Sequence, residues 1–321
     1  MPRRNAPDAA AVARFRGDLE ALTGPLGARR LALAVSGGAD SMAMLALAAA
    51  AYPGQIASAT VDHGLRLESP IEALMVAQYC DRIGVPHATL AISEARPATG
   101  NLHAWARERR YALLRDWAVA QGCAFLLTAH HADDQAETFL MRAARGSGIA
   151  GLAGIRAMVD GDPPVARPLL GWRAAILRAV ALRADVPFVD DPSNIDERYE
   201  RARVRAMLDT LEWLDGGRIA AAASHVAEAD AALNQIADAA WLRRSEDAAE
   251  VAFNVEALPR EIRRRLARLA IRTLQPDGGS DNIEALLDSL QAGKTATHGD
   301  VIASAKGEIW RFAPAPPRRS H

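Results

Sequence analysis

Short apolar runs of about the length of a β-strand alternate with stretches of helical spacing along the first half of the chain. The apolar runs occupy residues 31–35, 55–61, 87–92 and 124–128. The stretches of helical spacing occupy residues 9–22, 40–51, 71–83, 102–121 and 133–144. Strands that alternate with helices of this length are typical of a parallel sheet covered by helices on both faces. We therefore expect a doubly wound, Rossmann-like α/β domain whose ligand lies at the carboxyl ends of the strands.

The pattern changes after residue 144. A glycine- and proline-rich loop region covers residues 145–168, and a turn is expected near Asp190-Asp191-Pro192. Asp215-Gly216-Gly217 marks the expected domain boundary, and a chain of 321 residues is long enough for two domains. Further helices are predicted over residues 172–184, 218–245, 259–274 and 280–291, and two short strands that can pair over 297–302 and 308–312. We therefore expect an α/β domain over residues 1–215 and a smaller, mainly helical domain over residues 216–321.

Composition narrows the class of protein. Half of the residues are apolar and 24% are charged, which is typical of a folded globular protein, and the formal net charge is only −1. Lysine occurs only at Lys294 and Lys306, so arginine supplies nearly all of the basic side chains. Either the base composition of the genome or a need to bind phosphate can explain this excess of arginine. The two cysteines, Cys80 and Cys123, are far apart and form no C-x-x-C pair, which disfavours a zinc or iron–sulfur site and predicts a reduced, cytoplasmic protein. The longest apolar run, residues 42–52, is too short to span a membrane.

A polar glycine turn follows the first predicted strand. Its residues are Ser36, Gly37, Gly38, Ala39, Asp40 and Ser41. Two glycines let the backbone approach an anion closely, and the free N–H groups of the following helix favour negative charge. Asp40 cannot attract phosphate, so it suits a magnesium ion that bridges phosphates. The alternative is an ordinary strand–helix turn in which Asp40 or Ser41 caps the helix.

Two other glycine patterns resemble nucleotide motifs by letters alone. Residues 146–151 match G-x-G-x-x-G but follow a predicted helix, whereas the dinucleotide motif follows a strand. Residues 293–295 end like a Walker A loop, but Asp288 stands where that loop needs glycine. We reject both.

The turn S-G-G-x-D-S resembles the pyrophosphatase loop of the N-type ATP pyrophosphatases, which cleave ATP between its α- and β-phosphates. Further segments, in the same order, resemble the tRNA(Ile)-lysidine synthases, and the likeness covers residues 31–205. These segments are Val61-Asp62-His63-Gly64-Leu65-Arg66, Asn101 with residues 106–111, Thr128 to Thr138, residues 145–155, Arg167-Pro168-Leu169, and Asp191-Pro192-Ser193-Asn194 with Arg198-Tyr199 and Arg203-Val204-Arg205.

This resemblance implies a reaction and its participants. ATP would adenylate the C2 oxygen of the wobble cytidine in a tRNA(Ile) with a CAU anticodon, and free L-lysine would then displace AMP to form lysidine. ATP and Mg²⁺ are the implied co-substrate and cofactor, residues 1–215 the catalytic domain, and residues 216–321 a tRNA-binding domain. A homodimer is compatible with the sequence, which does not fix the oligomeric state.

Site residues follow from the resemblance and from their places after the predicted strands. The expected catalytic residues are Asp40, Arg66, Arg107, His131 and Asp134. The expected nucleotide-binding residues are Ser36, Gly37, Gly38, Ala39, Asp40, Ser41, Asp62 and His63, with Asp40 as the magnesium ligand. The expected substrate-binding residues are Arg110, Asp133, Asp134, Glu137, Arg203 and Arg205.

Each of these assignments has a plainer alternative. The acidic residues at 133–137 can complement a helix dipole instead of holding magnesium or the lysine substrate. The arginine-rich stretches 198–205 and 260–272 can be solvated helix faces instead of contacts to RNA phosphates. Trp213 and Trp241 can stack on an unpaired base, but packing in a core or interface is the more common use of tryptophan.

Two rival functions also stay open. A related cytidine 2-thiolase would share the glycine turn but typically needs paired cysteines for sulfur chemistry, which Cys80 and Cys123 do not provide. A regulatory nucleotide-binding module would share the loop, but binding alone does not require charged groups after several successive strands.

Overall fold

A computed structural model of the chain describes residues 6–62, 69–93, 102–190, 200–211, 213–247, 250–276 and 282–316. The chain divides into two compact units, Met1–Ala227 and Glu228–His321. The division falls inside helix α9 (Gly216–Trp241), whose first residues coincide with the expected boundary at 215–217. The assignment of domains to residues 1–215 and 216–321 remains a prediction. Among the helices described, none is long and apolar enough to cross a membrane.

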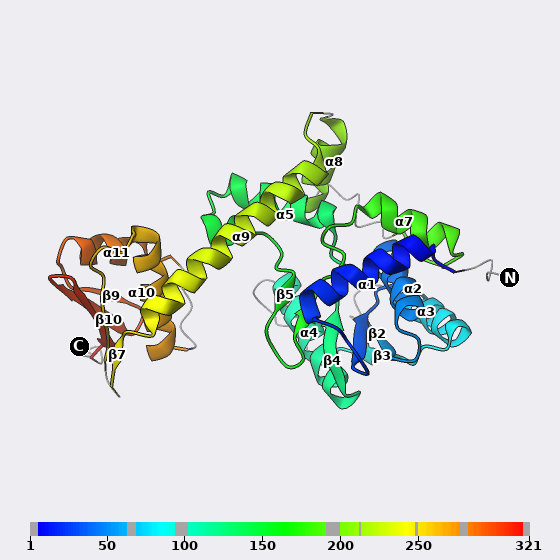
Figure 1. Cartoon of the computed structure of the whole chain (residues 1–321), viewed down its shortest axis with the longest axis horizontal. Helices are drawn as coiled ribbons and strands as arrows, with labels where there is room; N and C mark the ends of the chain where they lie inside the picture. The colour runs from blue at the N-terminus through cyan, green and yellow to red at the C-terminus, as the bar shows by residue number, and fades with distance from the viewer. Residues whose placement is uncertain are drawn as a thin grey trace. The chain divides into compact units, whose positions relative to one another are not determined.

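The first unit contains a six-stranded sheet with the order β3-β2-β1-β4-β6-β5. Figure 1 labels β2, β3, β4 and β5 of this sheet. Five strands are parallel, and β5 joins the edge antiparallel to β6. The strands are β1 (Arg30–Ala34), β2 (Ile56–Asp62), β3 (His87–Ala91), β4 (Cys123–Leu127), β5 (Met158–Val159) and β6 (Val165–Ala166). This arrangement confirms the predicted doubly wound sheet. The strand order reverses between β1 and β4, where ligands bind in such sheets.

Helices cover both faces of this sheet. The helices of the first unit are α1 (Ala9–Thr23), α2 (Ala39–Ala51), α3 (Ser69–Ile83), α4 (Leu102–Ala120), α5 (Ala132–Ala144), α6 (Ile149–Leu152), α7 (Ala174–Arg183) and α8 (Glu200–Thr210). α1, α2, α3 and α7 pack on one face, and α4 packs on the other.

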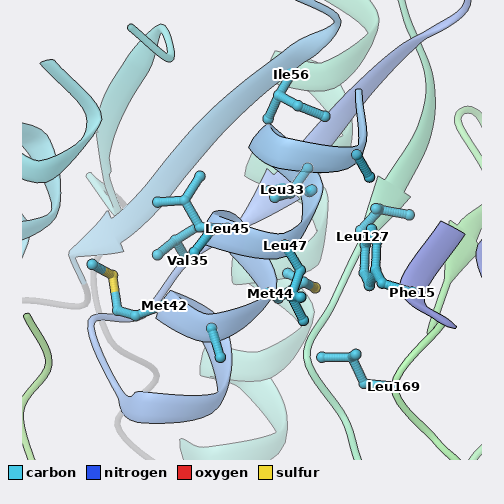
Figure 2. Packing of buried hydrophobic residues seen from close by; sticks show 14 of the residues in the cluster. Phe15, Leu33, Val35, Met42, Met44, Leu45, Leu47, Ile56, Leu127 and Leu169 are labelled. Atoms are coloured by element: carbon cyan, nitrogen blue, oxygen red, sulfur yellow. The ribbon is translucent and has the colours of Figure 1, made fainter. Parts of the chain in front are cut away.

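The two faces of β1 differ in the size of their side chains. Leu31 and Leu33 point into the larger core, where they meet α2 residues such as Leu45 and Leu47 (Figure 2). Ala32 lies on the opposite face, in a smaller cluster with Leu114 of α4. Alternate residues of a strand face opposite sides, so both faces of β1 are buried and its sequence reads as a continuous apolar run.

The region that the sequence predicted as a loop, residues 145–168, contains α6 and the strands β5 and β6. Each of these strands is only two residues long, too short for any periodic pattern. β6 nevertheless extends the parallel sheet, because Val165 and Ala166 pair with Leu126 and Leu127 of β4. The structure also adds helix α8, which the sequence did not predict.

The second unit combines α10 (Arg260–Leu274), α11 (Glu284–Gln291) and the end of α9 with a five-stranded antiparallel sheet. Its strand order is β7-β8-β11-β10-β9, from β7 (Ser245–Glu246), β8 (Val251–Asn254), β9 (Ala296–His298), β10 (Val301–Lys306) and β11 (Ile309–Pro314). The buried rings of Phe253 and Phe312 stack with centroids 5.4 Å apart. The unit therefore contains more strand than a mainly helical prediction implied.

Local geometry explains this difference. The single strand predicted over residues 297–302 is two strands, because the chain turns at Gly299, whose φ of 59° is in the left-handed region. Residue 245, predicted as the end of a helix, begins β7. β8 is a strand because it pairs with β11, although the four residues of β8 carry no distinctive sequence pattern.

Candidate active site

The glycine turn between β1 and α2 is held in shape by its own serines. The amide of Ser36 donates to Ser41 Oγ at 3.1 Å, and Ser41 Oγ donates to the carbonyl of Gly38 at 3.0 Å. Gly37 has a φ of 87°, which side-chain-bearing residues rarely adopt. The amide of Val189 closes the turn from outside by donating to the carbonyl of Gly37 at 3.0 Å. A rigid turn of this kind presents the free amides of the first turn of α2 to an anion.

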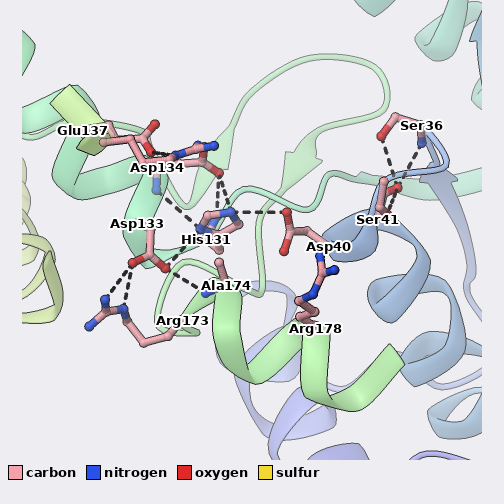
Figure 3. Close-up of polar contacts among 12 residues, drawn as sticks. Ser36, Asp40, Ser41, His131, Asp133, Asp134, Glu137, Arg173, Ala174 and Arg178 are labelled. Atoms are coloured by element: carbon pink, nitrogen blue, oxygen red, sulfur yellow. Dashed lines mark hydrogen bonds and ion pairs between the residues drawn. The ribbon is translucent and has the colours of Figure 1, made fainter. Parts of the chain in front are cut away.

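Asp40 and Asp134 meet at one imidazole (Figure 3). His131 caps α5: its amide donates to Asp134 Oδ2 at 3.1 Å, and the amide of Asp134 donates to His131 Nδ1 at 3.4 Å. His131 Nε2 lies 3.4 Å from Asp40 Oδ2 and 3.5 Å from Asp134 Oδ2. The structure thus joins the residues that follow β1 to those that follow β4.

The charge around His131 determines its protonation. Burial lowers the pKa of this imidazole, but the hydrogen bond to Asp40 and the charges of Asp134, Asp40 and Asp133 outweigh burial, so the net shift of the pKa is upward. Because His131 Nδ1 accepts from the Asp134 amide, the proton of this ring is on Nε2, which faces the carboxylates of Asp40 and Asp134.

Asp133 has a different environment. Its Oδ1 accepts a hydrogen bond of 2.8 Å from Arg173 Nε, and its Oδ2 accepts one of 2.7 Å from the amide of Ala174, the first residue of α7 (Figure 3). Both carboxylate oxygens are therefore engaged inside the protein. This carboxylate fixes the start of α7, and little of its hydrogen-bonding capacity is left for a substrate.

Glu137 is the most buried of the expected acidic residues, with 1% of its surface exposed. Its Oε1 accepts a hydrogen bond of 2.7 Å from Arg205 Nε, and its Oε2 lies 3.4 Å from Arg201 Nε without a hydrogen bond. Burial raises the pKa of this carboxyl group, and the bond to Arg205 opposes the rise. Arg201 and Arg205 are four residues apart on α8 and so reach the same region.

Helix α4 adds a basic and aromatic wall. The guanidinium groups of Arg107 and Arg110 lie over the ring of Tyr111, at 5.1 and 5.4 Å from its centroid. Burial lowers the pKa of Arg110. Burial raises the pKa of Tyr111. A hydrogen bond from Arg167 and the nearby arginine charges lower this pKa by more than burial raises it, so the net shift is downward.

Two cavities meet at these residues. The first, of about 420 Å³, is lined by the glycine turn, the start of α2, residues 107–114 of α4 and residues 128–130. The second, of about 480 Å³, is lined by the charged side chains of Asp40, His131, Asp133, Asp134, Glu137, Arg173, Arg201, Arg205 and Asp209. Asp40, Asp134 and Arg201 line both cavities. The first cavity suits an anion, and the second suits a molecule that carries charges of both signs.

Most of the expected site residues lie around these cavities, but some do not. Gly37, Ala39 and Asp62 line neither cavity, and Arg203, which is exposed on α8, also lies outside both linings. His63 and Arg66 lie outside the described residues. The structure adds residues that we did not assign to the site: Thr128, His130, Tyr111, Arg173 and Arg201. For Arg201 a signal was present, since it is four residues before Arg205.

The arginine-rich stretch 260–272 is mostly used within the second unit. Arg260 and Arg264 both pair with Glu284, and the buried Arg265 pairs with Asp230 at 2.7 Å. This pairing differs from both interpretations of the sequence, because all three guanidinium groups are already bound to carboxylates within the unit, although Arg260 remains 37% exposed.

The two tryptophans that we considered as base-stacking residues differ. Trp213 is 76% exposed, whereas Trp241 is partly buried beside Phe253, with ring centroids 6.1 Å apart. An exposed ring can stack on an unpaired base. Of these two tryptophans, only Trp213 is exposed enough to stack on a base.

Comparisons with known proteins agree with this geometry. Residues 12–211 match the family model described as the PP-loop domain. The tRNA(Ile)-lysidine synthase of Novosphingobium aromaticivorans is 43% identical over 319 residues, which cover 97% of this chain and 95% of that protein. The tRNA(Ile)-lysidine synthase of Zymomonas mobilis is 42% identical over 313 residues, which cover 93% and 92%.

A solved structure shows the same fold at low sequence identity. The U34-tRNA thiolase NcsA from Methanococcus maripaludis superposes with a TM-score of 0.56 and 18% identity, over 68% of this chain and 80% of that chain. This likeness concerns the fold alone. The matched PP-loop domain and the two synthases lead to one conclusion: the chain belongs to the tRNA(Ile)-lysidine synthase family of PP-loop proteins.

Proposed function

We propose that this enzyme uses ATP to join free L-lysine to C2 of the wobble cytidine in a tRNA(Ile) with a CAU anticodon, releasing AMP and pyrophosphate. One observation carries the proposal: two cavities of different charge share Asp40, Asp134 and Arg201 at the point where the strand order reverses. A ligase that first activates one substrate with ATP and then admits a second needs two such adjoining spaces.

The first cavity is assigned to ATP. The amides at the start of α2 and the hydroxyl groups of Ser36 and Ser41 face the polyphosphate, and Arg107 and Arg110 neutralise its charge from α4. Asp40 fits a magnesium ligand, because its carboxylate is 37% exposed and lies on the first turn of α2. When bound there, magnesium would offset the negative charge that develops as pyrophosphate leaves.

The second cavity is assigned to lysine. Its arginines suit the carboxylate of the amino acid, and its acidic residues suit the ammonium groups. The attacking amine must reach the activated cytidine where the two cavities meet. Asp134 lines both cavities, whereas Asp133 is already bonded to Arg173 and Ala174. We therefore assign Asp134 to the attacking amine.

The second half-reaction then balances simply. The amine nitrogen bonds to C2 of the cytidine, the bond between C2 and the AMP oxygen breaks, and AMP leaves with that electron pair. The amine loses a proton, and we assign its acceptance to the cluster of Asp134 and His131, whose Oδ2 and Nε2 lie 3.5 Å apart. C2 is not accessible in a stacked base, so the cytidine must be turned out of the anticodon stack.

Contacts with the tRNA body are assigned to exposed arginines. On α8, Arg203 is exposed, and on α10, Arg272 is exposed without an ion pair among the described residues. Residues 216–321 are proposed to hold the tRNA through such phosphate contacts.

The buried cysteines favour lysidine formation over thiolation. Cys80 and Cys123 are free and buried, and burial raises the pKa of both thiols. A thiol with a raised pKa is a poor nucleophile and a poor sulfur carrier. Free buried cysteines also suit a cytoplasmic protein.

One assay tests the proposed function. Pyrophosphate release should require ATP, Mg²⁺ and the tRNA, and labelled lysine should appear in the tRNA only when all are present. A tRNA whose wobble cytidine is replaced by uridine is the matched control and should accept no lysine. Sulfur incorporation, or pyrophosphate release without lysine transfer to any tRNA, would contradict the proposal.

A further inference from the structure

Arg167 is a buried guanidinium that has no acidic partner in the described part of the chain. It follows strand β6, is 6% exposed, and forms no ion pair with any described carboxylate. Its Nη1 donates to the carbonyl of Arg156 at 2.7 Å, and its amide donates to the carbonyl of Ala157 at 2.8 Å. A charge that is buried without a counter-ion is costly to the fold, which suggests a functional reason for its position.

The remaining donors of Arg167 reach two residues that line the first cavity. Arg167 Nε donates to His130 Nδ1 at 3.3 Å, and Arg167 Nη2 donates to Tyr111 Oη at 3.4 Å. Thr128 Oγ1 also lies 3.0 Å from His130 Nδ1. Arg167 therefore binds the walls of the nucleotide cavity without lining it.

A guanidinium has donors and no acceptor, and this restricts His130. The contact with Arg167 Nε requires Nδ1 to accept, and the hydroxyl of Thr128, which can donate or accept, then donates to the same nitrogen. The imidazole is then neutral, and its proton is on Nε2. Burial and the charges of Arg167, Arg107 and Arg110 agree with this, since together they lower the pKa of His130 to about 3 despite the charge of Asp134.

The proton on Nε2 has no acceptor among the described residues. Nε2 is also not a fully buried atom, and His130 lines the first cavity. This N–H group is therefore available to a molecule in the cavity. The neighbouring His131 has the opposite character, because its Nε2 faces the carboxylates of Asp40 and Asp134.

We propose that Arg167 is a positioning residue that fixes His130 in the Nε2–H tautomer, and that His130 donates this hydrogen bond to a phosphate oxygen of the bound nucleotide. A neutral donor binds an oxyanion without transferring a proton to it. The two adjacent histidines therefore have different roles. His130 holds the nucleotide, and His131 belongs to the acid–base cluster. The ligand in this proposal rests on the proposed function, but the tautomer does not.

The tautomer is tested directly by ¹⁵N NMR of the nucleotide-free protein with labelled histidine, using His130→Gln to assign the signal. We expect an unprotonated Nδ1 and a protonated Nε2 from pH 8 to pH 5. In Arg167→Met the preference for this tautomer should weaken, while the exposed control Arg311→Gln should leave it unchanged. A proton on Nδ1, or a doubly protonated ring, in the unaltered protein would overturn the proposal.

Two substitutions of His130 test its donor. The amide nitrogen of Gln can occupy the place of Nε2, whereas that of Asn lies nearer the place of Nδ1. We expect His130→Gln to keep the KM for ATP within a few-fold and His130→Asn to raise it about tenfold or more, as loss of a hydrogen bond to a charged group does. Equal KM values for ATP in both variants and the unaltered enzyme would refute the donor role.

These outcomes separate the two proposals. If the unaltered protein does not use ATP, the proposed function fails while the NMR result still decides the tautomer. If it forms lysidine but His130 has its proton on Nδ1, only the present inference fails. If Arg167→Met does not fold, the His130 variants and the NMR of the unaltered protein still decide.

Discussion

Asp133 and Asp134 are adjacent in sequence, yet the structure predicts different consequences for their loss. Asp133 holds the start of α7 through Arg173 and Ala174, whereas Asp134 faces both cavities. Replacing each with asparagine keeps its size and removes its charge. We expect Asp133→Asn to impair stability and Asp134→Asn to impair use of lysine.

The magnitudes follow from the contacts. The ion pair of Asp133 with Arg173 is partly exposed and contributes about 1 kcal/mol at most. Asparagine keeps an oxygen that can accept from the Ala174 amide, but the negative charge at the start of α7 is lost, which costs up to about 1 kcal/mol. A total of about 2 kcal/mol should lower the Tm of a unit of this size by roughly 4–8 °C. Asp134→Asn keeps an oxygen for the His131 amide and should lower the Tm much less.

The two variants should also differ in their kinetics with lysine. Loss of a charge-assisted contact to the lysine amine should raise the KM for lysine, or lower kcat, roughly tenfold to a hundredfold in Asp134→Asn. Asp133→Asn should stay within a few-fold, measured at 20 °C where both variants are folded. The reasoning is refuted if Asp133→Asn keeps the normal Tm and raises the lysine KM as strongly as Asp134→Asn.

Three further predictions follow from other contacts. Asp40→Asn should fold normally, with a change of less than about 1 kcal/mol, and lose pyrophosphate release; near-normal release would exclude a role in binding magnesium. Arg265→Ala removes one partner of a buried ion pair, that with Asp230, and should cost about 3–5 kcal/mol in urea unfolding. Arg272→Ala should keep stability and reduce the salt slope of tRNA binding by about one unit; equal stabilities of the two variants would contradict this. Burial lowers the pKa of His87, so the unfolded chain binds a proton more readily than the folded protein, and stability should fall as the pH drops below about 6.5. His87→Gln should reduce this loss of stability between pH 7.5 and 5.5. An unchanged dependence of stability on pH would contradict the prediction.

The central elements of the first unit were predictable because their signals are local. β1 and α2 each carry a pattern set by burial over their whole length, and the glycine turn between them has few other uses. β6 has two residues, and it exists as a strand because it pairs with β4. A pattern along the chain cannot report pairing of that kind.

The candidate site likewise has features that the sequence could predict and features that depend on residues far along the chain. The sequence places Asp40 and His131 after neighbouring strands, so their meeting was foreseeable from the topology. The role of Asp133 was not, because it depends on Arg173, forty residues later. Arg260 and Arg264 looked like a free basic face for a similar reason: their partner, Glu284, lies on a different helix.

The shared lining of the two cavities has a thermodynamic consequence. Asp40, Asp134 and Arg201 face both spaces, so an occupant of one changes the charge that the other presents. The two binding equilibria are then linked, and linkage is reciprocal: whatever factor bound nucleotide applies to the affinity for the amino acid, the amino acid applies to the affinity for nucleotide. A titration of either ligand in the presence of the other therefore measures a single coupling free energy, which belongs to these three side chains and not to either cavity alone.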